Sequence, residues 1–447
     1  MKPFRHDYIT SQVLRFHQTA LRYSASALNV VAILEGRAQV KRFSRLSEMS
    51  AGDVFFVNAG EVWAMTSREG CTALCVEIET ALLPQVSYPY ADRVQLVDSL
   101  VDPDQTREVS LVYRDCIFLK DILETYALFN QKEKASQRPL MEEKLGLTLV
   151  MEYNVQNEIN RQFRAVSEDK FVRYYRIMDY IVTHLEEKLS LQQAADAEKM
   201  QKSYFAQLWK QNDNMTFLEC VSRCRLREAE RRLLFTAESN AGICKACGFS
   251  DSKYFYRNFQ QEFQMTPSQW KSRWTQGRCP DEERLSLAEG LRCVAVQQRQ
   301  LDYVKTDTRL YQQYLWLREG PETKAAALEL KLDLYHPDNV LMLGQQRVLT
   351  WYGFDLLMNI VRQRQLSVTL QLRMDCLLEP QDQQEFEELI AQVYARLGTR
   401  VTKNWKFELA CRSERELDQA EKLCGWLQKK LPTCKAVCCL LYTSRCV

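Results

Sequence analysis

Histidine and long apolar runs are both scarce in this chain of 447 residues. It contains four histidines, and none of them lies between His17 and His184. No apolar run approaches the roughly 18 residues that a membrane-spanning helix needs. The first residues, MKPFRHDYITSQ, lack the apolar core of a signal peptide. We therefore expect a cytoplasmic protein that makes no contact with a membrane.

A strong basic excess is also missing, since the formal net charge is +2. This balance does not exclude a nucleic-acid partner, because phosphate contacts depend on local rather than total charge. Between Phe171 and Trp274 there are sixteen Lys and Arg against twelve Asp and Glu, a net charge of about +4. The length exceeds that of one domain, and 46% hydrophobic residues is an ordinary globular composition. We expect three domains.

The sixteen cysteines form no recognisable disulfide framework. Cys220, Cys224, Cys244 and Cys247 make a Cys-x3-Cys followed by a Cys-x2-Cys, which is close to the spacing of a zinc site. Each of the four also falls where packed helices need a small apolar residue, a role that free cysteine fills well. We expect no metal and no cofactor, with a zinc site as the alternative. The scattered remainder favours reduced thiols.

The segment from Asn240 to Trp270 combines a short helix, a turn at Gly248 and a second helix. Glycine supplies the backbone freedom of the turn, and Ser250 or Asp251 can cap the helix that follows. Helical spacing predicts that Tyr254, Phe255 and Phe259 face the core. The outward side chains would be Ser252, Lys253, Tyr256 and Arg257, and these would meet a DNA groove. One such element alone is also compatible with an ordinary pair of amphipathic helices.

A second copy of this plan lies about fifty residues upstream, from Leu189 to Phe217. Leu191 and Ala195 would pack its first helix. In its second helix we expect Tyr204, Phe205 and Leu208 to face inward. Its candidate DNA contacts are Lys202, Ser203, Gln207 and Lys210. Between the two copies, residues 225–234 are strong helix formers with an apolar stripe at Leu226, Ala229 and Leu233, which predicts a stiff connecting helix.

Residues 173–274 resemble the DNA-binding domain of AraC-type transcription regulators. The resemblance rests on Tyr204, Phe205 and Lys210 in the first unit, Arg225, Leu226 and Ala229 in the connecting helix, and Gly248, Phe249, Tyr254, Phe255, Arg257, Phe259, Thr266 and Pro267 in the second unit. It implies two helix-turn-helix units that enter successive major-groove segments of double-stranded DNA. The expected phosphate contacts are Lys202, Lys210, Arg223, Arg225, Lys253 and Arg257. A homodimer and contact with RNA polymerase are further expectations.

The first unit departs from the family pattern at three positions. Gln201 stands where a good helix N-cap is usual, Asn214 where glycine is usual, and Ala206 places a short side chain on the outward face. We therefore expect the second unit to make more of the base contacts.

The region before residue 86 has a different character. Residues 30–34, 38–43, 54–58 and 73–78 are β-prone runs, separated by glycines that include Gly36, Gly52 and Gly60. This pattern predicts a small antiparallel barrel. The spacing of Gly52, Asn58, Gly60 and Trp63 resembles a motif of cupins, which implies a cupin-like sensor over residues 1–85. Metal-binding cupins place histidines in this motif, and this chain has no histidine there. We therefore do not expect a metalloenzyme.

Phe56 and Trp63 are candidates for an aromatic wall that binds a sugar or another small effector. Packing in the core is the alternative role for both rings.

Residues 86–165 are predicted to be a helical connector, because Cys116, Leu119 and Leu123 recur at helical spacing and residues 140–153 form another amphipathic run. This connector is a candidate dimerisation region, with a purely core role as the alternative.

After Trp274 a polar stretch, TQGRCPDEERLS, predicts a linker. Over residues 290–437 we expect strands at 325–335, 366–374 and 401–411 to alternate with helices at 354–361, 385–397 and 413–431. Repeated βα units of this length indicate a parallel sheet or a (β/α) barrel. We expect residues 438–447, where the composition changes abruptly, to be a non-native tail on a chain cut short of its natural end.

Residues 352–374 and 405–408 resemble the barrel of family 39 glycoside hydrolases, the fold of β-xylosidases. The resemblance implies a catalytic acid soon after Glu408, but Arg412 stands in its place. A guanidinium does not titrate near neutrality and cannot replace that carboxyl group. We therefore expect no enzymatic activity.

Together these patterns predict a multidomain α+β protein. It would contain an N-terminal cupin-like β-barrel with a helical connector, an all-α double helix-turn-helix domain over residues 166–275, and a C-terminal partial (β/α) barrel. The expected function is sequence-specific transcription regulation, with carbohydrate-use genes as expected targets by analogy. The alternative is a glycosidase of the β-xylosidase type fused to a DNA-binding module.

Overall fold

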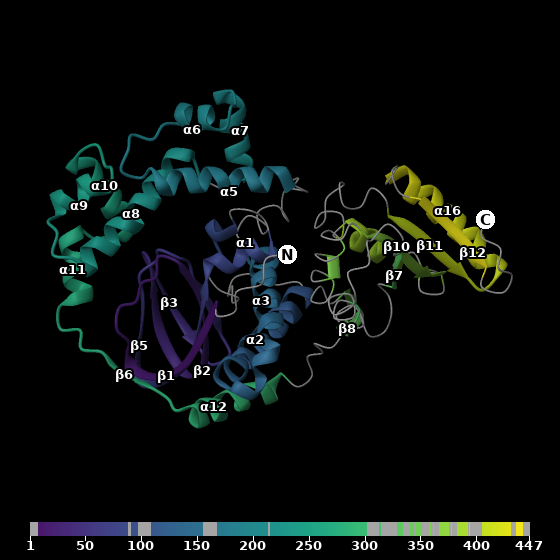
Figure 1. The fold of residues 1–447 in the computed structure, drawn as a ribbon, viewed down its shortest axis with the longest axis horizontal. Coiled ribbons are helices and arrows are strands. Elements are labelled where there is room, and N and C mark those ends of the chain that lie inside the picture. The colour runs from purple at the N-terminus through teal and green to yellow at the C-terminus, as the bar shows by residue number, and fades with distance from the viewer. Residues whose placement is uncertain are drawn as a thin grey trace. The chain divides into compact units, whose positions relative to one another are not determined.

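The computed structural model describes residues 8–87, 91–96, 109–154, 168–212 and 215–301. Nearer the C-terminus it describes residues 329–333, 340–343, 346–349, 366–374, 382–391, 405–430 and 435–440, with the single residues 313, 354, 357, 358, 361, 377 and 393. The chain divides into two compact units, one ending at Tyr303 and the other formed chiefly by the residues that follow (Figure 1). Within the described residues, no helix has the length and apolarity that crossing a membrane requires.

Six strands form an antiparallel N-terminal sheet. They are β1 (Ile9–Gln18), β2 (Ala27–Arg42), β3 (Arg45–Ser50), β4 (Val54–Val57), β5 (Trp63–Glu79) and β6 (Asp281–Arg284). Their order is β3-β2-β5-β1-β6, and β4 pairs with β2. The predicted runs at 30–34 and 38–43 belong to one long strand. Gly36, with a φ of 81°, forms an irregularity within that strand rather than ending it.

The concave interior of this sheet is filled with apolar side chains. The interior cluster consists of Leu14, Phe16, Val31, Ile33, Ala38, Val40, Met49, Phe55, Val57, Trp63, Met65, Cys71, Ala73 and Cys75. Alternation along β2 sends Val40 into this cluster and Lys41 to the opposite face, because successive side chains of a strand point to opposite sides.

The segment predicted as a linker after Trp274 returns to the N-terminal sheet instead. Strand β6 pairs with β1 in antiparallel register, so that Leu14 faces Arg284 and Phe16 faces Glu282. Helix α12 (Leu287–Gln300) follows, and its Gln297 donates to the Leu34 carbonyl at 2.8 Å. The predicted domain boundary at residue 290 therefore lies inside a helix of the first compact unit. The side chains of β6 are largely exposed at the sheet edge, so its sequence is polar and lacks the apolar alternation that predicts a strand.

Helical segments follow the sheet, as expected for residues 86–165. The short helix α1 (Leu83–Val86) precedes α2 (Val109–Asn130) and α3 (Arg138–Glu152). Short 3-10 turns cover Thr80–Leu82, Ala91–Arg93 and Lys132–Gln137. Phe56 of β4 packs between Phe118 and Tyr153, with ring centroids 5.7 and 5.2 Å away, which joins the sheet to α2 and the end of α3.

Over residues 168–212 and 215–275, the structure shows seven helices that form the next domain. They are α5 (Glu168–Thr183), α6 (Leu191–Ala197), α7 (Lys202–Asn212), α8 (Phe217–Phe235), α9 (Asn240–Ala246), α10 (Ser252–Phe263) and α11 (Pro267–Thr275). Two capping boxes stand fifty residues apart. In the first, Thr216 caps α8 with Glu219. In the second, Thr266 caps α11 with Gln269. Each predicted unit is therefore followed by a helix that begins with a threonine capping box.

The C-terminal unit contains a parallel sheet in the order β12-β11-β10-β7, formed by β7 (Glu329–Asp333), β10 (Ser367–Arg373), β11 (Lys406–Cys411) and β12 (Lys435–Leu440). Helix α16 (Glu414–Lys430) connects β11 to β12. The order along the chain confirms the predicted parallel βα arrangement. An antiparallel pair, β8 (Val340–Leu343) and β9 (Gln346–Leu349), was not predicted. Strand β12 continues beyond the boundary predicted at residue 437, since Cys438 pairs with Leu409.

Candidate nucleic-acid interface

The second unit presents a polar surface on α10. Asp251 caps this helix by accepting a hydrogen bond from the Tyr254 N–H at 2.7 Å, which satisfies a free backbone donor. Phe255, Phe259 and Phe263 recur every four residues and are buried. The four residues predicted to face DNA are all exposed: Ser252, Lys253, Tyr256 and Arg257. The Arg257 guanidinium lies 5.1 Å from the centre of the Tyr254 ring, so this half-buried tyrosine supports it.

The first unit presents a similar surface on α7. Phe205 and Trp209 are buried and stack at 6.3 Å. The candidate contacts Lys202, Ser203, Gln207 and Lys210 are all exposed. The prediction that Tyr204 faces inward is wrong, because 48% of it is exposed. Trp209, one turn after Phe205, fills the core in its stead. The side chain of Leu208 lies outside the described residues.

The two units place different residues at the left-handed position of the turn between their helices. In the second unit, Gly248 has a φ of 73°, a left-handed conformation that glycine adopts readily. A side-chain carbon there would also lie 2.1 Å from the Leu185 carbonyl oxygen. In the first unit, Lys199 occupies the corresponding place with a φ of 55°, although it carries a side chain. The first turn is therefore the more strained of the two.

Contacts of the connecting helix hold the two units together. Arg225 donates to the Leu185 carbonyl at 3.0 Å and to the Glu187 carbonyl at 2.6 Å, both in the loop that precedes α6. Burial lowers the pKa of this guanidinium. Arg225, which was predicted as a phosphate contact, thus has a structural role, because its Nε and Nη2 both donate to carbonyls within the domain.

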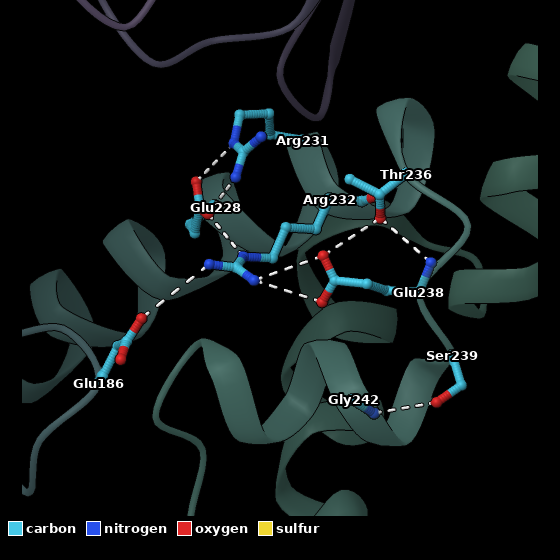
Figure 2. Close-up of polar contacts among 8 residues, drawn as sticks. All are labelled: Glu186, Glu228, Arg231, Arg232, Thr236, Glu238, Ser239 and Gly242. Carbon is cyan, nitrogen blue, oxygen red and sulfur yellow. Dashed lines mark hydrogen bonds and ion pairs between the residues drawn. The ribbon is translucent and has the colours of Figure 1, made fainter.

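A second set of contacts surrounds Arg232, as Figure 2 shows. Its guanidinium donates to Glu228 at 2.7 Å and to Glu238 at 3.3 Å, and it lies 4.0 Å from Glu186 of the first unit. Arg231 binds the same Glu228 carboxylate through two nitrogens. Burial by itself would raise the pKa of Glu228, but the hydrogen bonds from Arg231 and Arg232 outweigh burial and lower it. Arg231 and Arg232 therefore stabilise the fold of this domain through their bonds to Glu228.

The cysteines of the zinc alternative lie in at least two different surroundings. Cys220 of α8 contacts the Met178 sulfur at 3.8 Å. Cys244 and Cys247 belong to the apolar core of the second unit. Burial raises the pKa of the Cys247 thiol to about 12, which keeps it protonated at neutral pH. No group of three or more candidate metal ligands gathers within the described ranges.

The two candidate effector residues do not form a common wall. Trp63 lies in the interior cluster, edge to face with Phe55 at 6.3 Å, whereas Phe56 points toward α2. Neighbouring positions of β4 explain this separation, because Phe55 and Phe56 must face opposite sides of the sheet. Both candidate rings are buried against other apolar side chains.

In the C-terminal unit, Glu408 accepts a hydrogen bond from Gln371 at 3.3 Å across the β10–β11 pair. Arg412 is exposed, and its backbone N–H donates to Glu416 at 2.7 Å. The Ser413 hydroxyl accepts from the Glu416 N–H at 3.3 Å, so this corner is the start of α16. Residues 412–416 thus form a helix cap.

Comparison with known proteins agrees with this geometry. Residues 194–273 match the model of a helix-turn-helix domain family. The chain is similar to the uncharacterized HTH-type transcriptional regulator YdeC of Bacillus subtilis (strain 168), with 26% identity over 55% of this chain and 83% of that one. The HTH-type transcriptional regulator SAS0078 of Staphylococcus aureus (strain MSSA476) is 19% identical over 55% of this chain, which spans only 31% of that longer relative.

Among solved structures, a transcriptional regulator with an AraC-type DNA-binding domain from Chromobacterium violaceum is 22% identical and has a TM-score of 0.23, covering 25% of this chain and all of that one. Residues 194–273 therefore form a helix-turn-helix domain. Both of these relatives are named as HTH-type transcriptional regulators.

Proposed function

We propose that this protein is a sequence-specific regulator of transcription that binds double-stranded DNA through α7 and α10. The observation that carries the proposal is a pair of helices, each of which exposes polar and basic side chains on one face while its opposite face is buried. These residues are Lys202, Ser203, Gln207 and Lys210 on α7 and Ser252, Lys253, Tyr256 and Arg257 on α10. A helix of this kind places donors and acceptors within reach of base edges in the major groove.

The contacts of Arg225 and Arg232 support binding by both units at once. These contacts tie the loop at Glu186 to the connecting helix and to the start of α9. Helices α7 and α10 therefore keep one relative orientation. Two such helices on one side of a duplex would contact major-groove segments about 10 base pairs apart. An operator with two subsites at one fixed spacing is therefore part of the proposal.

The other domains are assigned as follows. Residues 1–85 would be a cupin-like sensor for a small effector, residues 86–165 a connector that takes part in homodimer formation, and residues after the α12 helix a partial (β/α) barrel. The antiparallel N-terminal sheet and the sequential parallel order of β7, β10, β11 and β12 support the fold expected in the first and the last of these assignments. Carbohydrate-use genes as targets and RNA polymerase as a partner remain part of the proposal.

We infer no glycosidase function for the C-terminal unit. Arg412, at the position of the acid that the resemblance implies, cannot supply a titrating proton, and its backbone takes part in a helix cap.

The experiment that tests the function is selection from a random duplex library with the whole chain, followed by nuclease footprinting on the selected sequence. We expect two protected stretches about one helical turn apart. Selection that enriches no sequence, at a salt concentration where non-specific binding is weak, would refute the proposal.

A further inference from the structure

The apolar core of the second unit is completed by residues of the N-terminal sheet. Phe43, at the turn between β2 and β3, and Val62, before β5, are buried together with side chains of α8, α9, α10 and α11. The Phe43 ring lies edge to face with Phe263, the last residue of α10, at 5.0 Å. Phe43 holds a left-handed φ of 46°, so the turn directs this ring into the core at a conformational cost.

A buried ion pair lies beside this ring. Lys41 of β2 is 1% exposed and binds Glu230 of α8, which is fully buried. The Lys41 ammonium also donates to the Val62 carbonyl at 2.8 Å, and Trp270 of α11 donates to the same Glu230 oxygen at 3.0 Å. The ammonium lies 5.5 Å from the Trp270 ring centre. Such a pair tolerates little misplacement, because either charge without its partner would be buried uncompensated.

Further contacts surround the same unit. Ser44 donates to Glu262 near the end of α10 at 2.7 Å, and Arg227 of α8 donates to Glu61 at 3.2 Å. After α11, Arg278 donates to the Thr19 carbonyl at 2.7 Å, where the chain returns to pair with β1. Helix α5, which leads into the first unit, is tied to the 3-10 turn at Ala91–Arg93 by Arg93 and Asp179, each of which is 32% exposed, and Asn154 donates to its buried Tyr175 hydroxyl.

We propose that Lys41, Phe43 and Glu230 are positioning residues for DNA binding: they set the placement of α10, although none of them lies on its exposed face. This inference rests on the proposed function. Strand β2 places Lys41 directly after Val40, whose side chain lies in the interior cluster. A change in that interior is therefore passed to α8 and α10 through one strand. Among the described residues, the first unit contributes no side chain to this cluster, and it would keep its own contacts.

The test uses the whole chain and the duplex that the wild type selects from the random library. Lys41→Met keeps an unbranched side chain one atom shorter and removes its charge, which leaves Glu230 without its cation. Glu230→Gln keeps the shape of its side chain and leaves Lys41 without its anion. We expect each single variant to lose footprint protection at the subsite of the second unit and to bind at least tenfold more weakly. Protection at the subsite of the first unit should persist.

The double variant Lys41→Met, Glu230→Met separates positioning from simple loss of folding. It removes both buried charges, and we expect it to regain most of the affinity and the second footprint. Gln39→Met, an exposed position on the same strand, is the matched control and should bind as the wild type does. Lys253→Ala should weaken binding without changing the thermal unfolding midpoint.

Three results would overturn the inference. The first is that the single variants retain both footprints at wild-type affinity. The second is that they lose both footprints in parallel with their helical circular dichroism. The third is that the double variant is fully folded and binds no better than the singles. Failure of the wild type to select any sequence is a separate outcome, which refutes the proposed function and the inference with it.

Discussion

The two helix-turn-helix units share one plan but differ in how each is held. Their buried aromatic positions correspond, Phe205 with Phe255 and Trp209 with Phe259, and both end in a threonine capping box. The second unit turns through glycine and shares its core with the N-terminal sheet, whereas the first turns through Lys199. The comparison teaches that a repeated sequence pattern sets the internal packing of each unit, while its surroundings set how firmly it is placed.

The largest expected effect comes from Gly248→Ala. The substitution would place a carbon 2.1 Å from the Leu185 carbonyl oxygen and force alanine into a left-handed conformation. Since backbone rather than a flexible side chain must move, we expect a loss of about 3 kcal/mol or more in the free energy of unfolding. Urea denaturation followed by circular dichroism measures it. Gly277→Ala, where nothing lies within 4 Å, is the control for the left-handed conformation alone. Equal losses in the two variants would show that the contact with Leu185 carries no energy.

The next effect concerns DNA affinity and compares matched positions on the two reading helices. Arg257→Ala should weaken binding to the selected duplex by roughly 1 to 3 kcal/mol if the guanidinium contacts a base edge. Gln207→Ala, at the equivalent place on α7, should cost less, because a neutral amide makes weaker contacts than a guanidinium. Gel-shift titration at fixed salt measures both. A larger loss for Gln207→Ala would reverse the expected ranking of the two units.

A smaller effect of opposite sign is expected for Lys199→Gly. Glycine would relieve the left-handed conformation of this residue, whose φ is 55°, and should raise the free energy of unfolding by about 0.5 to 1 kcal/mol. The same denaturation experiment measures it, with Lys202→Gly in the first turn of α7 as a control that should destabilise. No gain for Lys199→Gly would mean that the first turn is not the more strained of the two.

The smallest effect is a pH dependence carried by Glu228. Its pKa is lowered in the folded state, so the stability that it contributes is present above its unfolded pKa and is lost as the pH falls through the folded pKa. The stability difference between the wild type and Glu228→Gln should therefore shrink as the pH falls from 7 toward 3. A difference that stays constant over this range would show that the carboxylate charge is unimportant for the contacts with Arg231 and Arg232.

Local sequence patterns were enough to predict most of the helix-turn-helix domain. Three local features act within one or two helical turns and can be recognised from the sequence alone. They are the spacing of Phe255 and Phe259, the cap at Asp251 and the glycine at position 248. Tyr204 was misplaced because Trp209, which fills the core in its stead, lies one turn further along the same helix. The role of Arg225 could not be predicted either, because its carbonyl partners at Leu185 and Glu187 lie some forty residues earlier in the chain.

The N-terminal sheet shows the same division. Its antiparallel strands follow from β-prone runs and glycine spacing, but strand β6 joins from beyond the helix-turn-helix domain, and a run of acidic residues at a sheet edge carries no apolar alternation to reveal it. From the sequence, Phe56 and Trp63 were equally plausible as core or ligand residues, and the structure buries both rings, Trp63 in the interior cluster and Phe56 against α2.

The sequence by itself determined the secondary structure of the two units, the outward faces of α7 and α10 and the parallel βα arrangement near the C-terminus, because each depends on the spacing of side chains along one segment. Only the tertiary structure decided that Lys41 and Phe43 complete the core of the second unit, that Arg225 and Arg232 join the two units, and that the chain after Trp274 returns to β1. These contacts pair residues far apart in the sequence, and whether a charged side chain is buried against a partner is decided by the packing of whole elements.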